Sequence, residues 1–411
     1  MYSRAVNHHM QLQSAAGTGP WPAAGAEEDM WTPSDQGLYT RRERQVQTGP
    51  YHRAVLPAIR HAIPSVASEV SAHVDEATTE IARFDAELGG EIASFSAVLL
   101  RTESTASSRI EHLSASARAI ATAEVDERAA PRNAAEIVAN AQAMQTATDL
   151  GDRIDGAGIL AMHRVLMARH PGEAGRWRDQ QVWIGAGEAG PRIAEYVPPR
   201  HQSVPGLIDD LVEFMARTDM PVLVQTAIAH AQFENIHPFT DGNGRTGRVI
   251  VQAMLRSKGL TSHAPVPVSA GLLTDTQAYF RALTAYRGGE VAPIVSMMAA
   301  AAIRAIANSR ELVVGLRAIR DEWKATVRVR RGAAAWRLAD LLVRQPVITS
   351  GIVAKELGLL PGNVARTLRP FEEAGVLVSS AGSSRLSKVW RAPQILAELD
   401  SFADRAGRRV S

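Results

Sequence analysis

Apolar positions from about residue 51 onward recur mostly at three- and four-residue spacings, as in helices that bury one face. The segment VDEATTEIARFDAEL, at 74–88, is typical, and the abundant alanines also favour helix through their intrinsic propensity. We expect further helices over about 205–217 and 221–233, and another that begins after the glycine-rich stretch at 241–247. The pattern therefore predicts a mainly α fold.

Strand signals are few, and the clearest lies in QVWIGAGEAGPRIAEYVPP at 181–199. Two short runs of β-branched or aromatic residues flank a glycine-rich turn, which predicts a β-hairpin that the two prolines terminate. Residues 1–50 show no periodicity and mix Gly, Pro, Ala, Gln and scattered charge, so they are expected to form a disordered tail.

Composition narrows the class of protein. The 411 residues suggest two or three domains, and 45 Lys and Arg against 43 Asp and Glu leave no global charge excess that would indicate nucleic acid or membrane binding. Cysteine is absent, which excludes disulfides, Cys-ligated zinc and thiol nucleophiles. The sequence starts without an apolar signal region, and no stretch approaches about 18 uninterrupted apolar residues. We therefore expect a cytoplasmic protein that does not associate with membranes.

The most informative stretch is HPFTDGNGRTGR at 237–248. Its three glycines surround Asn243 and precede a predicted helix, so backbone N–H groups can turn inward and form an anion cradle at the positive end of that helix. Arg245 and Arg248 are three residues apart and can grip two phosphate groups from one helix face. A polyphosphate is the ligand that this arrangement favours.

Three other residues of the stretch complete the chemistry. Asp241 would be repelled by phosphates unless a divalent cation stood between them, and Mg²⁺ suits that position. The near-neutral pKa of histidine makes His237 the plausible general base, whereas Phe239 is expected in the core. Taken singly, a glycine-rich loop and an isolated histidine are usually structural. Two arginines in the first turn of a helix, however, cost about 0.3–1 kcal/mol each unless an anion is present.

HPFTDGNGRTGR matches every defined position of HxFx(D/E)GNGRxxR, the signature of the Fic family, and the chain resembles that family from about Tyr51 to Ile306. The segments HAQFENIHPF, QVWIG…AEYVPP and TQAYFRALTAYRGGE carry the wider resemblance. Most Fic enzymes transfer AMP from ATP to a hydroxyl side chain of a target protein and release pyrophosphate. The resemblance implies the same activity here, with ATP as substrate and Mg²⁺ as the metal.

The resemblance also implies a role for individual residues. His237 would deprotonate the target Ser, Thr or Tyr, and Asp241 would hold Mg²⁺ between the α- and β-phosphates. The hairpin would be the Fic flap, which docks the target as an added strand; a plain surface hairpin is the alternative. The phosphates would meet Gly242, Asn243, Gly244, Arg245, Thr246, Gly247 and Arg248; the target would meet Val182, Trp183, Ile184 and Gly185; and adenosine would meet Tyr279, Phe280 and Arg287. For the two aromatic residues, ordinary core packing is an alternative.

RTESTASSRIEHLSAS, at 101–116, begins as a Ser- and Thr-rich helix and resembles the inhibitory helix of Fic proteins, (S/T)xxxE(G/N). Ser107 and Glu111 occupy its defined positions, whereas His112 stands where Gly or Asn is usual. A carboxylate paired with Arg248 would take the place of the γ-phosphate and hold ATP unproductively. The alternative is an ordinary surface glutamate. Removal of AMP by the same glutamate, through an activated water, is left open.

The last hundred residues are more basic: 18 Lys and Arg against 10 Asp and Glu between Arg310 and Ser411. Residues 333–393 predict a helix, a short helix, a turn, a second helix and two strands, which resembles a winged helix-turn-helix. On DNA, Arg366 and Arg369 would enter the major groove, and Arg385 and Lys388 would contact phosphates. Homodimerisation or target binding through this module are the alternatives.

The expected fold is a Fic-type helical core with a β-hairpin flap, followed by a small winged-helix domain. Two other functions remain open: a nucleotide-sensing regulator that binds DNA, and a Fic enzyme that transfers another group. The expected division of the chain is a tail at 1–50, a helical region with the inhibitory helix at 51–150, the Fic core at 151–306, a linker helix at 307–332, the winged helix at 333–393 and a C-terminal tail at 394–411.

Overall fold

The computed structural model describes residues 21–32, 47–88, 92–149, 151, 154–185, 190–329, 334–380 and 388–407. Helices dominate, as the spacing of apolar residues predicted. The helices before the glycine-rich loop are α2 (Ser68–Leu88), α3 (Ile92–Ile110), α4 (Ala117–Val125), α5 (Arg132–Asp149), α6 (Gly156–Leu166), α7 (Val204–Ala216) and α8 (Val222–Ile236). After the loop come α9 (Asn243–Ser257), α10 (Val268–Leu273), α11 (Thr276–Arg287), α12 (Ala292–Thr326), α13 (Ala334–Arg344), α14 (Ser350–Leu357), α15 (Pro361–Glu373) and α16 (Pro393–Gly407).

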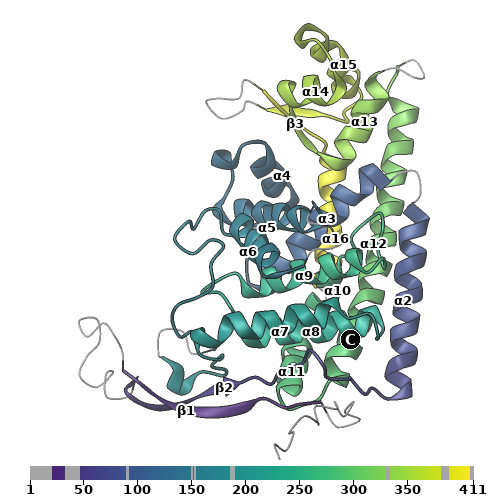
Figure 1. Ribbon diagram of the computed structural model, residues 1–411. Helices are drawn as coiled ribbons and strands as arrows, with labels where there is room; N and C mark the ends of the chain where they lie inside the picture. The colour runs from purple at the N-terminus through teal and green to yellow at the C-terminus, as the bar shows by residue number, and fades with distance from the viewer. Residues whose placement is uncertain are drawn as a thin grey trace, which may run out of the picture.

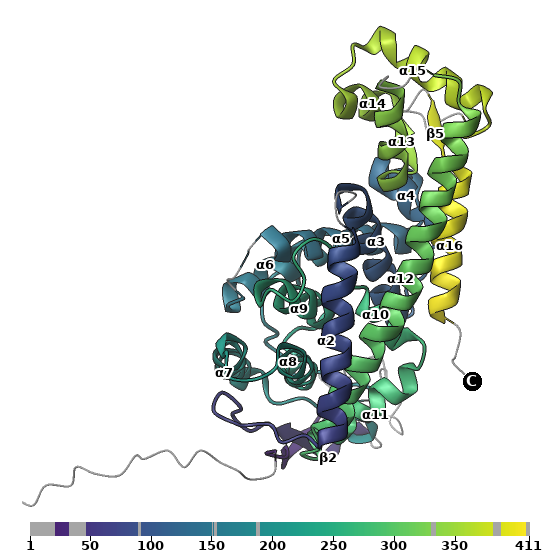
Figure 2. The same cartoon turned by 90° about the vertical axis from the view of Figure 1, so that its right-hand side faces the viewer.

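The helix α12 runs along most of the molecule and connects its two ends (Figure 1). It packs against α2, α8, α10, α11 and α16, and in the side view α2 and α16 flank it (Figure 2). By length and composition alone α12 could cross a membrane, with a mean hydropathy of 1.3 over its most apolar window. Half of that window is buried inside the structure, and the helix packs on several others, as the core helix of a globular protein does.

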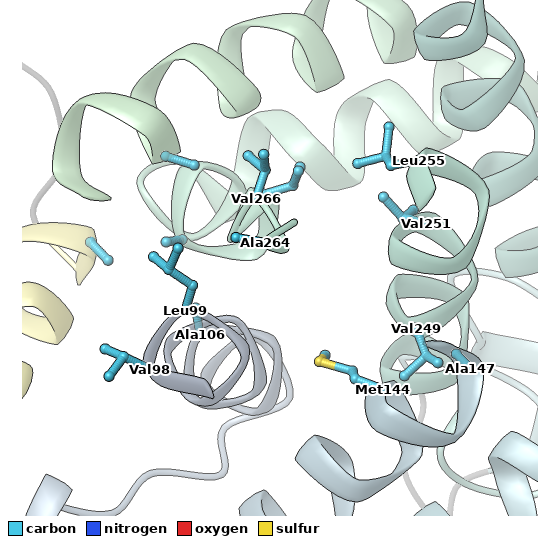
Figure 3. Packing of buried hydrophobic residues seen from close by; sticks show 14 of the residues in the cluster. Val98, Leu99, Ala106, Met144, Ala147, Val249, Val251, Leu255, Ala264 and Val266 are labelled. Carbon is cyan, nitrogen blue, oxygen red and sulfur yellow. The ribbon is translucent and has the colours of Figure 1, made fainter. Parts of the chain in front are cut away.

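The main hydrophobic core joins α3, α5, α9 and the segment that leads into α10. Figure 3 shows side chains from these elements facing a common interior, among them Leu99 of α3, Met144 of α5 and Val251 of α9. The helix α8 lies inside the bundle, and nearly every one of its residues is buried. Its buried residues include polar ones, among them Gln225, His230 and Asn235, so the helix is enclosed on all sides although it is not apolar throughout. The motif that connects α8 to α9 is thus anchored by buried helices at both ends.

Two small sheets complete the fold. Strands β1 (Gly25–Trp31) and β2 (Gly49–Val55) are antiparallel, with Gly25 opposite Val55 and Trp31 opposite Gly49. In the C-terminal module, β3 (Val347–Thr349), β5 (Val389–Arg391) and β4 (Val378–Ser380) form a sheet in the order β3-β5-β4. The module lies at the end of the molecule opposite β1 and β2 (Figure 1).

Three of the expected boundaries differ from the structure. Part of the expected tail at 1–50 forms β1 and the first residues of β2, and Trp21 is buried against Phe214 and Tyr286. The expected C-terminal tail contains α16, which packs against α12 and α3. The expected linker helix at 307–332 is largely the second half of α12, so the boundary at 306 falls inside a continuous helix. Strand β1 has no buried alternation that could have indicated it. The helix α16, in contrast, carries buried apolar residues at helical spacing, such as Ile395, Leu399 and Phe402, so the expectation of a tail overlooked a signal that the sequence contains.

The hairpin predicted at 181–199 is also different. Its only pairing among the described residues is an isolated bridge between Ile184 and Tyr196, followed outward by the short 3-10 helix Pro191–Ile193. Residues 186–189, at its turn, lie outside the described part of the chain. The segment is nevertheless tied to the N-terminal sheet, since Ala54 of β2 donates a backbone hydrogen bond to Val197 and Trp183 packs edge-on against Trp31 of β1.

Candidate active site

The glycine-rich loop is held between two unusual backbone positions. His237 ends α8 in the left-handed conformation, with φ of 48°, and Gly242 caps α9 with φ of 79°. A Cβ at Gly242 would lie 3.2 Å from side-chain atoms of Leu166 and Met167, a tight approach, and the positive φ itself favours glycine. Asn243 donates to the carbonyl of Phe239 at 2.9 Å and accepts from its N–H at 2.8 Å. This clamp fixes the loop that leads into the N-terminus of α9.

The imidazole of His237 has the properties of a general base. Burial lowers its pKa to about 4, so the ring is neutral near pH 7. Its Nδ1 lies 3.3 Å from the carbonyl oxygen of Glu234. With the proton on Nδ1 donated to that carbonyl, Nε2 keeps its lone pair for a substrate proton. The predicted role therefore has a suitable tautomer and charge.

A second buried histidine supports the loop and was not found from the sequence. His163, on α6, stacks on Phe239 with a centroid distance of 3.6 Å. Its Nδ1 accepts from the N–H of Gly175 at 3.0 Å, so its Nε2–H donates to the carbonyl of Asp241, also at 3.0 Å. Burial lowers its pKa to about 4, which keeps it neutral in this bridging role. An isolated histidine on a helix carries no sequence signal for such a contact.

The two arginines of the motif are buried and already paired with acids of this chain. Arg245 lies 3.3 Å from Glu136 of α5 and 3.7 Å from Asp241. Arg248 donates through Nε to the hydroxyl of Ser107, at 2.9 Å. Its Nη2 donates to the Ser107 carbonyl and to Glu111 Oε1, both at 2.8 Å. Carboxylates of the protein therefore offset the unfavourable interaction of these two cations with the positive end of the helix.

Glu111 lies directly on the anion loop. A Cβ built on Gly244 would be 1.9 Å from Glu111 Oε1, so the carboxylate contacts the backbone of the loop itself. The helix α3 ends at Ile110, and His112 adopts φ of 61°, a left-handed conformation that glycine or asparagine takes more easily. The departure of His112 from the usual pattern therefore leaves the geometry of the helix end intact, at the cost of local strain.

The remaining motif residues are internal. Thr246 is 1% exposed, and its hydroxyl has no hydrogen-bond partner. A side chain on Gly247 would meet Glu234 Oε1 at 2.8 Å and Phe233 at 3.1 Å, so this glycine allows α9 to approach α8. Burial raises the pKa of Glu234 to about 7. A second, largely enclosed acid therefore lies beside the start of α9, three residues before His237.

The residues expected to contact adenosine are not gathered on one surface. Tyr279 is 1% exposed, and its hydroxyl forms a 2.8 Å hydrogen bond with Nε2 of His230. Its position matches the alternative expectation, that this residue packs in the core. Phe280 is half exposed. Arg287 stacks on Tyr196 at 4.0 Å and donates to Asn235 at 2.7 Å, beneath the flap segment. Of the flap residues, Val182, Trp183 and Ile184 are partly buried and Gly185 has φ of 90°.

The site fits a magnesium ion that arrives with its ligand better than a resident metal. Within the described residues, no group of three or more His, Asp and Glu side chains could hold a metal ion. The Asp241 side chain is 63% exposed, and one of its oxygens accepts from the N–H of Gly242 at 2.6 Å. Mg²⁺ commonly binds one or two carboxylates together with substrate phosphates. Asp241, at the mouth of the loop, matches that donor set.

Comparison with known proteins agrees with this geometry. Residues 153–255 match the Fic/DOC family model. Protein adenylyltransferase Fic of Nematostella vectensis is 30% identical over 152 residues, which are 36% of this chain and 32% of that protein. Protein adenylyltransferase fic-1 of Caenorhabditis elegans is 34% identical over 149 residues, which are 36% of this chain and 27% of that protein. The chain thus spans about a third of the length of these curated relatives.

A solved structure extends the likeness. The crystal structure of a Fic family protein from Desulfovibrio desulfuricans G20 superposes with a TM-score of 0.52 at 25% identity. The superposition covers 82% of this chain and 98% of that one. The arrangement of helices is therefore shared well beyond residues 153–255.

Proposed function

Because residues 153–255 are a Fic/DOC family domain, we propose that the protein transfers AMP from ATP to a hydroxyl side chain of a target protein. The observation that carries the proposal is the placement of a neutral His237 directly before a clamped anion loop that is bordered by two buried guanidinium groups. A nucleoside triphosphate is the ligand with enough negative charge to meet both Arg245 and Arg248 at the N-terminus of α9.

In the proposed reaction, Nε2 of His237 takes the proton of the target hydroxyl. The hydroxyl oxygen forms a bond to the α-phosphorus, and the bond from that phosphorus to the bridging oxygen of the β-phosphate breaks. Pyrophosphate leaves, held by N–H groups of α9 and by the arginines. Mg²⁺ bound with the triphosphate at Asp241 would neutralise charge on the phosphate oxygens.

We further propose that the structure represents the inhibited form. Glu111 contacts Gly244 and pairs with Arg248, so its carboxylate lies where a terminal phosphate would meet the loop. Self-modification is the form of the activity that the isolated protein is expected to show once Glu111 is removed.

Incubation of the Glu111→Gly variant with α-labelled and with γ-labelled ATP tests the function. Transfer of the α-label to protein, its loss in a Glu111→Gly/His237→Ala double variant, and no transfer of the γ-label are the expected results. Transfer of the γ-label would mean phosphorylation. Binding of ATP without transfer of either label to the protein or to added lysate would instead favour a nucleotide sensor.

DNA binding by the C-terminal module is a second proposal. The module has the order α13, β3, α14, α15, β4, β5, and Arg366 and Arg369 are exposed on α15. Arg369 lies 3.7 Å from Glu373 and Lys388 lies 3.0 Å from Glu372, whereas Arg385 lies outside the described residues. A gel-shift series should show affinity that falls steeply with salt. An unshifted duplex at low salt would leave dimerisation or target binding as the role of the module.

A further inference from the structure

Arg178 is a buried arginine whose guanidinium bonds only to backbone carbonyls. It is 4% exposed, and none of the ion pairs that the structure describes involves it. Its Nε donates to the carbonyl of His237 at 2.9 Å, its Nη1 to that of Gln180 at 3.0 Å, and its Nη2 to that of Pro199. Burial of a cation without an acid is costly, so its position is maintained only because these three carbonyls converge on it.

The three carbonyls belong to segments whose relative placement matters for the proposed reaction. Gln180 directly precedes the flap segment at 181–199, and Pro199 is its last residue. His237 carries the base in a left-handed conformation with φ of 48°, which its neighbours must maintain. The backbone N–H of Arg178 also donates to the carbonyl of Pro238, at 2.9 Å. One rigid, planar side chain therefore joins both ends of the flap to the backbone of the general base.

We propose that Arg178 is a positioning residue for AMP transfer, which sets the distance between the His237 imidazole and a target hydroxyl presented by the flap. The inference rests on the proposed function. Nothing in the sequence motif assigns a role to this residue, because its partners lie in three separate segments. Within the part of the chain that the structure describes, the hydrogen bonds of the guanidinium go to backbone carbonyls of these segments, and Arg178 does not belong to the glycine-rich loop.

A second connection keeps the flap attached when Arg178 is replaced. The Tyr196 hydroxyl donates to the carbonyl of Asn235 at 2.7 Å, and Arg287 packs on the Tyr196 ring while donating to the Asn235 side chain. The flap is thus fastened to the end of α8 at two places. Loss of Arg178 should loosen the alignment of the flap with the base without unfolding the segment.

Two substitutions separate position from charge. Arg178→Lys keeps the cation but can direct its donors at fewer of the carbonyls, whereas Arg178→Gln removes the charge as well. Because a misplacement of about 1 Å costs up to about 100-fold in rate, we expect both to lower kcat of AMP transfer roughly 10- to 100-fold. ATP affinity should remain within about twofold, because the anion loop is held by Asn243 and His163.

The pH profile supplies a readout that a purely structural role would not move. The Arg178 charge lowers the pKa of His237, whereas Asp241 and Glu111 raise it. In the Gln variant the pKa of His237 should therefore rise, and the acid limb of the rate should shift to higher pH. In the Lys variant the limb should remain near that of the parent, although kcat is reduced.

The test is made in the Glu111→Gly background of the full chain, with incorporation of α-labelled ATP, calorimetry with ATP, and thermal unfolding measured for each variant. Arg176→Gln is the matched control, since Arg176 is exposed and lies two residues upstream. If the Glu111→Gly parent incorporates no label, the proposed function fails, and the positioning role of Arg178 fails with it. If the parent is active, unchanged kcat in both Arg178 variants overturns the inference. Parallel loss of ATP affinity and thermal stability would also overturn it, because that result marks a general structural role.

Discussion

Replacement of Glu111 by glycine should activate the protein, and the structure sets the size of the effect. The carboxylate makes one charge-assisted hydrogen bond, 2.8 Å long, to a guanidinium that is 2% exposed, while its own side chain is 41% exposed. Such bonds contribute about 1.5–3 kcal/mol when well buried. Exposure of the glutamate to solvent lowers this to about 1–2 kcal/mol.

This free energy is the cost of moving Glu111 off the loop before a triphosphate can occupy it productively. A cost of about 1–2 kcal/mol corresponds to a competent fraction lowered roughly 5- to 30-fold. Glu111→Gly should therefore raise the initial rate of AMP incorporation by about that factor. Glu111→Gln retains the side-chain volume but loses the charge, so its rate of AMP incorporation should lie between the rates of wild type and Glu111→Gly.

The assay is incorporation of α-labelled ATP at subsaturating nucleotide, with calorimetry to confirm that each variant binds ATP. Glu76→Gly is the matched control, because it makes the same substitution at an exposed helical position on α2. The control should leave the rate at the wild-type level. Equal rates in wild type and Glu111→Gly, with ATP bound by both, would refute the inhibitory role of the contact.

Three further predictions follow from the site. His237→Ala in the Glu111→Gly background should lower AMP transfer about 10²- to 10⁴-fold with ATP binding retained by calorimetry, and retained turnover would exclude the residue as the base. His112→Gly should relieve the strain of a left-handed residue, stabilise the end of α3 by about 1 kcal/mol in denaturant titrations, and lower residual AMP transfer; lower stability would contradict it. Burial raises the pKa of Glu103 from 4.5 to about 7 in the folded state, so the folded protein binds the extra proton and the free energy of unfolding should fall as pH rises from 4.5 to 7. Glu103→Gln should lack this part of the fall, and superposable pH profiles of the two proteins would show that Glu103 is ionised in the fold.

The sequence could place the residues of the glycine-rich loop next to one another because they are contiguous in the chain. His237, Asp241, Arg245 and Arg248 lie within two buried helices and their connection, so local spacing determines their arrangement. The pairing of Glu111 with Arg248 was anticipated only through the family resemblance, since 137 residues separate the two. The helix boundaries of α7 and α8 differ from the expected ones by a few residues.

Residues whose role depends on partners far away in the chain could not be predicted from the sequence. His163 contacts Asp241 across 78 residues, and Arg178 contacts His237 across 59. Strand β1 has almost no buried residues and is held in place by its pairing with β2. Its sequence therefore lacks the alternation of apolar and polar residues from which a strand could be predicted. The flap was predicted as two strands, yet outside residues 186–189 its pairing is limited to one bridge.

The helix α16, which follows the C-terminal module, contacts α3, the helix that ends one residue before Glu111. After the module the chain returns along α12, and Arg109, two residues before Glu111, donates to the carbonyl of Ala403 in α16. At the other half of α3, Arg101 bonds both to Glu124 and to the carbonyl of Arg344 at the end of α13. We therefore expect that a molecule which favours one placement of the module also alters how readily Glu111 leaves Gly244 and Arg248.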